Sequence, residues 1–96
     1  MTEIELKNTI QRANRAEELL NDEMIQEFII QLRGDLLNKF ESAGLHEDKE
    51  RMDAWQQGQV LKMFLDKFQK KIKEGKNART ELNFLAKAAQ NIRRII

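Results

Sequence analysis

The apolar residues of this chain recur three or four positions apart, which is the spacing that places side chains on one face of an α-helix. The strongest stripe comprises Ile25, Phe28, Ile29, Leu32, Leu36 and Phe40. A second stripe comprises Ala54, Gly58, Leu61, Leu65, Phe68 and Ile72, and a third comprises Leu82, Leu85, Ala89, Ile92 and Ile96. β-Branched residues are sparse, and no long stretch alternates apolar and polar positions. The pattern therefore predicts an all-α protein.

Two helix starts are marked near the N-terminus. Thr2 and Glu5 have the spacing of a capping box, so a first helix is expected from there to Leu20. Asn21 or Asp22 has the side-chain oxygen that a second helix needs at its N-cap. The alternative at this point is one continuous helix with a kink.

Three further boundaries depend on glycine and on small polar residues. Gly44 is expected to end the second helix in a left-handed conformation, with Leu45 folding back on the last turn. A third helix is expected to begin between residues 46 and 50 and to end at Gly75. A fourth would then begin at Asn77 or Thr80.

These elements predict an antiparallel bundle of three to four helices with short loops, in which the second and third helices form a central helical hairpin. The length of 96 residues is that of one small domain, so a single helical domain over 1–96 is expected. The N-terminal helix 2–20 has a thin apolar stripe. It either packs on the bundle or moves independently.

Part of the apolar surface is not used by these stripes. Met24, Ile30 and Leu37 belong to the second helix but lie outside its apolar stripe. We expect them to contact a protein partner or another copy in a homo-oligomer. The alternative is that the fold closes over them. Trp55 is expected to anchor the core, and the small residues Ala54 and Gly58 are expected to let another helix approach closely.

Composition excludes several classes of protein. The chain has no cysteine, which excludes disulfides, cysteine-ligated zinc and thiol catalysis. No apolar run approaches the roughly 20 residues of a membrane span, so no membrane association is expected. The N-terminal segment lacks the apolar block of a signal peptide.

The net charge of +1 conceals an uneven distribution. Residues 1–60 have a net charge of −6 and residues 61–96 a net charge of +7. The two halves either neutralise each other, within one fold or between subunits, or leave the basic half free for nucleic acid. In the second case the phosphate contacts would be Lys67, Lys70, Lys71, Lys73, Lys76 and Arg79.

No catalytic motif is present. His46, Glu50 and Asp53 share one helical face, but acidic residues are expected at a helix start, and we expect no metal site there. The acidic cluster from Glu17 to Glu27 is interpreted as a solvated face. Glycine-rich phosphate loops are absent. The sequence therefore predicts a protein that is not an enzyme and has no cofactor.

Several segments resemble a group of small helical proteins encoded by tailed bacteriophages and prophages, often beside virion and packaging genes. The residues are the run Arg15–Asp22 followed by the helix Met24–Phe40, and Asp48–Arg51 leading to Trp55, Leu61 and Gly75–Lys76. The resemblance spans roughly residues 12 to 80. It implies an accessory protein that acts through protein contacts in assembly, packaging or host takeover, in the host cytoplasm or in the virion. It assigns no role to any residue.

Overall fold

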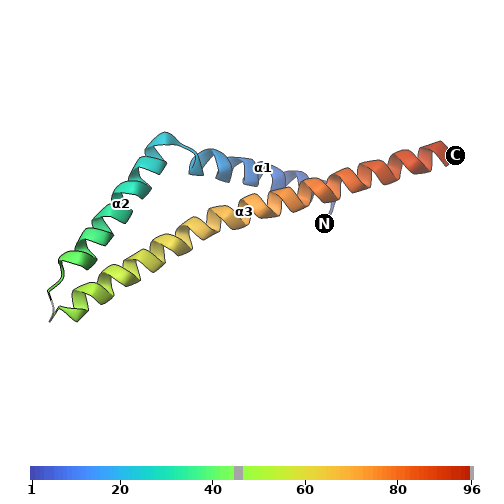
Figure 1. The fold of residues 1–96 in the computed structure, drawn as a ribbon. Helices are drawn as coiled ribbons and strands as arrows, with labels where there is room; N and C mark the ends of the chain where they lie inside the picture. Colours follow the sequence, from blue (N-terminus) through green and yellow to red (C-terminus); the bar gives the residue numbers. More distant parts are fainter. Residues whose placement is uncertain (45–46, 96) are drawn as a thin grey trace. The chain divides into compact units, whose positions relative to one another are not determined.

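The computed structural model describes residues 1–44 and 47–95, and within them the chain is all-α, as predicted. It has three helices, α1 (Glu3–Leu20), α2 (Glu23–Ser42) and α3 (Asp48–Ile95) (Figure 1). The chain divides into two compact units that share α3. The terminal unit is Met1–Glu18 with Phe68–Ile96, and the hairpin unit is Leu19–Lys67. The expectation of a single domain over 1–96 stays a prediction.

The predicted third and fourth helices are one helix of 48 residues, so the four-helix alternative is wrong. Gly75 lies inside α3 and is buried, and no described glycine has a positive φ. A helical glycine costs about 1 kcal/mol relative to alanine, which does not by itself end a helix. Neither Gly75 nor Gly44 is therefore a left-handed cap. Leu45 and His46 lie outside the described residues.

The two predicted N-terminal caps are present. The backbone amide of Glu5 donates to the hydroxyl oxygen of Thr2 at 3.2 Å, which begins α1. The Asp22 carboxylate accepts from the amides of Met24 and Ile25 at 3.0 and 3.1 Å. Because Asp22 interrupts the helical backbone, the alternative of one kinked helix is wrong.

The terminal unit pairs α1 with the second half of α3 through small residues. Ala13, Ala16 and Ala78 are buried, and Gly75 lies against Ala13. Leu6 lies three residues before Thr9 and seven before Ala13, which places it on the same side of α1, and it is fully buried. The N-terminal helix is thus packed on α3 within its unit (Figure 1).

The hairpin unit pairs α2 with the first half of α3 in antiparallel directions. At the turn, the Arg51 guanidinium donates to the carbonyl oxygen of Ala43 at 3.0 Å, and the amide of Gly44 donates to the Glu47 carboxylate at 2.9 Å. Its buried apolar residues are Ile29, Ala43 and Ala54. Each unit therefore contains a helix pair, and an antiparallel bundle of three to four helices is not confirmed.

Candidate protein interface

Large apolar side chains are exposed throughout the hairpin unit. Eleven of them, on α2 and the first half of α3, are between 44% and 68% exposed. They are Met24, Phe28, Ile30, Leu32, Leu37, Phe40, Met52, Trp55, Val60, Met63 and Phe64. Single exposed apolar residues are ordinary, but a cluster of this kind is typical of a surface that another molecule covers.

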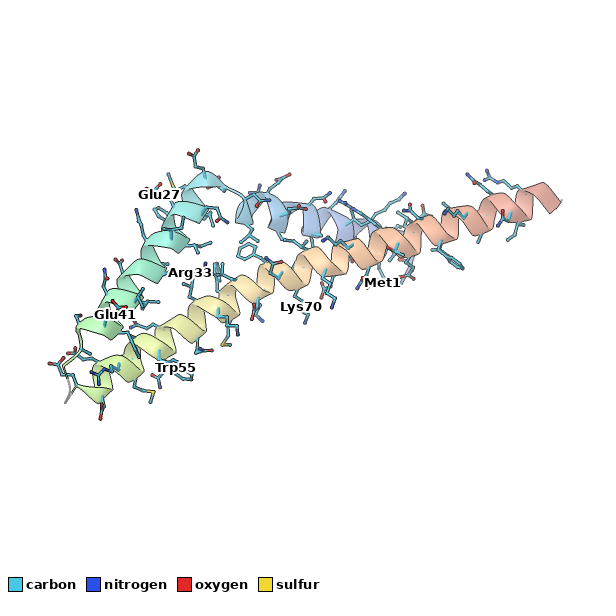
Figure 2. All side chains as sticks on the ribbon, in the orientation of Figure 1. Met1, Glu27, Arg33, Glu41, Trp55 and Lys70 are labelled. Carbon is cyan, nitrogen blue, oxygen red and sulfur yellow. The ribbon has the colours of Figure 1, made fainter. Side chains whose placement is uncertain are left out.

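Two grooves run between the helices of this unit. The first groove has a volume of about 340 Å³ and is lined by Leu37 and Phe40 of α2 and by Trp55 and Gly58 of α3. Arg33 and Lys62 also line it, one from each helix. The Trp55 side chain projects from α3 (Figure 2) and is 56% exposed. The first groove therefore combines apolar walls with cationic side chains.

The second groove has a volume of about 380 Å³ and is lined by Leu32 of α2 with Val60 and Phe64 of α3. Leu36 and Leu61 line both grooves, so these two half-buried leucines form the seam between the helices. The apolar stripe of each helix is wider than its partner helix covers. The excess appears as one groove on each side of the seam.

The structure separates the three predicted interface residues into two groups. Leu37 lines the first groove, and Ile30, seven residues earlier, lies on the same side of α2. Met24 is six residues before Ile30, which places it about 120° away around the helix. All three are exposed, at 61% for Met24, 68% for Ile30 and 55% for Leu37.

Trp55 was predicted to anchor the core, and this prediction is wrong. The buried position belongs to Ala54, and the next residue along a helix points about 100° away. The stripe of Ala54, Leu61 and Leu65 contained this signal, since Trp55 is outside it. An aromatic residue one position beyond a stripe lies at the edge of the interface between helices rather than inside it.

Gly58 also has a different environment from the one predicted. A Cβ atom on Gly58 would meet nothing within 4 Å, so no described helix approaches it closely. Gly58 instead lines the first groove. The space above it is open to another molecule.

The ion pairs of the described residues all join positions within one helix. They are Lys7–Glu3, Arg15–Glu18, Arg51–Asp48 and Lys71–Glu74, at 3.1 to 3.6 Å. Exposed pairs of this kind contribute at most about 0.5 kcal/mol each. Charge therefore contributes little to holding the described helices together.

The predicted phosphate contacts also divide between the units. Lys67 belongs to the hairpin unit, and Lys70, Lys71, Lys73, Lys76 and Arg79 belong to the terminal unit. All six are exposed. Lys71 pairs with Glu74, and the Arg79 guanidinium donates to the side-chain oxygen of Asn14.

The two units also differ in net charge, although less than the two halves of the sequence do. The terminal unit has 11 Lys/Arg and 6 Asp/Glu, a net charge of +5, and the hairpin unit has 6 and 10, a net charge of −4. The two helix pairs therefore have net charges of opposite sign. The apolar grooves belong to the acidic unit.

Within residues 1–44 and 47–95, no three His, Cys, Asp or Glu side chains are grouped closely enough to hold a metal ion. His46 lies outside this part of the chain. None of the described helices combines the length and apolarity needed to cross a bilayer.

Comparison of this chain with protein-family models, curated proteins and solved structures finds no match. The resemblance to phage-encoded helical proteins stays a prediction. The interface is therefore interpreted from its own geometry.

Proposed function

We propose that this chain is a non-catalytic interaction protein that associates with a second copy of itself through the first groove. In this dimer, two α2–α3 hairpins pack into an antiparallel four-helix bundle. A helical hairpin with one open apolar side is half of such a bundle. The observation that supports the proposal is the open groove lined by Leu37, Phe40 and Trp55.

The hairpin unit buries few large apolar residues, which supports a partner as large as a second copy of the chain. Two of its three buried apolar residues are alanines, and a small helical unit with so little buried surface is marginal alone. Eleven half-exposed side chains at roughly 200 Å² each present about 1,000 Å² of apolar surface, which is divided between the two sides of the seam. A stable interface buries about 800 Å² on each partner.

The chemistry of the first groove suits a second copy of the chain. Trp and Arg are the residue types that contribute most at the centre of protein interfaces, and Trp55 and Arg33 both line this groove. A two-fold axis brings the same surface of both chains together.

An accessory role in phage assembly, packaging or host takeover extends this proposal. It rests on the resemblance of the segments within residues 12 to 80. The self-associating hairpin is compatible with that role and does not depend on it.

The test is the mass of the protein in solution, measured by sedimentation equilibrium for the wild type and for Leu37→Asp and Trp55→Asp. We expect the wild type to have twice the mass of the chain. We expect each variant to be monomeric, because a charge in the groove would lose its water on association. Circular dichroism at the same concentration verifies that the helices remain.

Val60→Asp is the matched control, since Val60 is exposed and lines the second groove but not the first. It is expected to remain dimeric. A wild-type monomer at high micromolar concentration would overturn the proposal. A dimer that only Val60→Asp dissociates would move the interface to the second groove and overturn the assignment to the first.

A further inference from the structure

The second half of α3 has a polar, basic face that α1 does not cover. Its members are Lys73, Asn77, Thr80, Phe84, Lys87 and Asn91, which follow one another at helical spacing. They are all exposed. We refer to these six residues as the α3 outer face.

The position of α1 shows on which side of α3 this face lies. Gly75 lies against Ala13 of α1, and Phe84 follows Gly75 by nine residues, which is two and a half helical turns. Phe84 is therefore on the opposite side of α3 from α1. It is 70% exposed, among the most exposed of the large apolar residues.

The surroundings of Phe84 are cationic and polar. Lys87 is three residues after it and Thr80 is four residues before it, so both lie next to its ring on the helix surface. Neither Lys73 nor Lys87 has an ion-pair partner within the described part of the chain. Glu81 is the acid next to the ring, three residues before Phe84, whereas Glu74 pairs with Lys71 and lies about 100° around the helix from Lys73 and Asn91.

We propose that the α3 outer face binds single-stranded nucleic acid, with Phe84 stacking on a base and Lys73 and Lys87 contacting phosphates. An exposed aromatic ring between cations is the arrangement that sequence-tolerant single-strand binding uses. The amides of Asn77 and Asn91 add donors and acceptors along the same line. The net charge of +5 on the terminal unit attracts a polyanion.

The chemistry of this face favours nucleic acid over an acidic protein. Its one large apolar residue is aromatic, and the exposed aliphatic residues Leu85 and Ile92 lie about 80–100° around the helix from Phe84, whereas the central part of a protein interface is usually apolar. The face extends about 27 Å from Lys73 to Asn91, at about 1.5 Å per residue. That length accommodates several nucleotides of an extended strand.

The test is fluorescence anisotropy of a labelled oligonucleotide of about 16 thymidines, and of a duplex of the same length, over a series of salt concentrations. We expect binding of the single strand at low salt, with a log–log salt slope of about −1.4 for the two phosphate contacts of Lys73 and Lys87. Phe84→Leu keeps an apolar side chain without the ring, and we expect it to weaken binding at least about fivefold. Phe84→Trp keeps an aromatic ring, and we expect it to bind the single strand as the wild type does.

The charge test uses the pair Lys73→Glu and Lys87→Glu in one chain. We expect the salt slope to become shallower by about 1.4, since two phosphate contacts are lost. The matched control is Lys7→Glu with Arg12→Glu on α1, which makes the same change in net charge off the face. This control variant is expected to retain most of the single-strand binding, with a salt slope similar to that of the wild type.

Three results would overturn the proposal. One is the absence of single-strand binding at low salt. The second is equal binding of the duplex with no effect of Phe84→Leu, which indicates non-specific attraction of a polyanion. The third is a change of solution mass in the Lys73→Glu, Lys87→Glu variant without nucleic-acid binding, which indicates an acidic protein as the partner. The mass of Phe84→Leu is expected to equal that of the wild type, so this test is independent of the hairpin dimer.

Discussion

Gly75 of α3 packs directly against Ala13 of α1, and a methyl group on Gly75 would overlap the methyl group of Ala13. The position that such a methyl group would take is 3.6 Å from the Cα atom of Ala13 and 3.9 Å from the carbonyl oxygen of Thr9. Both neighbours belong to the backbone or to the shortest of side chains, so no flexible atom can move aside. The missing side chain of Gly75 therefore sets the closest approach of the two helices.

Gly75→Ala is accordingly expected to destabilise the chain by about 1–3 kcal/mol, because α1 must shift to admit the methyl group. Gly34→Ala is the matched control, since Gly34 is also helical but exposed, with nothing within 4 Å of its Cβ position. It is expected to stabilise the chain by about 1 kcal/mol through helix propensity. Urea unfolding at equal protein concentration measures both. Equal stabilisation by the two substitutions would show that the contact between Gly75 and Ala13 is absent in solution.

The start of α2 offers a second prediction. Asp22→Ala removes the oxygen that accepts from the amides of Met24 and Ile25, and the expected cost is about 1 kcal/mol of unfolding free energy. Asn21→Ala next to it is expected to change stability little. Thermal unfolding followed by circular dichroism measures the difference. Similar losses in both variants would contradict the assignment of Asp22 as the cap.

Trp55 reports on the proposed dimer without any label. It is the only tryptophan, and 56% of it is exposed in one chain. If a second copy covers the first groove, its fluorescence emission shifts to shorter wavelength and acrylamide quenching falls as the protein concentration rises. Leu37→Asp is expected to keep the emission of an exposed tryptophan at every concentration. An emission spectrum of the wild type that is independent of concentration and equal to that of Leu37→Asp would contradict the dimer.

The helical content and the caps could be predicted because they depend on neighbours in the sequence. Thr2 and Asp22 act on amides two or three residues away, so the pattern of local residues was sufficient. The end of the third helix could not be predicted in this way. Glycine is a residue type that often ends a helix, but Gly75 is buried against Ala13 of α1. The position of α1 cannot be derived from the residues near Gly75 in the sequence.

Part of the candidate interface could be predicted, because that part also depends on spacing within one helix. Ile30 and Leu37 were identified because they lie off the apolar stripe of their own helix. Trp55 was assigned to the core although it lies outside the stripe of Ala54, Leu61 and Leu65, and this assignment was wrong. The α3 outer face could not be identified from the sequence, because scattered lysines become a face only once one side of the helix is known to be covered by α1.

The sequence by itself therefore determined that this protein is helical, where α1 and α2 begin, and that it has more apolar side chains than one helix pair covers. These properties follow from spacing and from contacts within about four residues. Only the tertiary structure decided that α3 is continuous, that the two helix pairs have net charges of opposite sign, and which apolar residues remain open. Those properties depend on which helix lies against which face, and that pairing is set by contacts between residues far apart in the chain, such as Ala13 with Gly75.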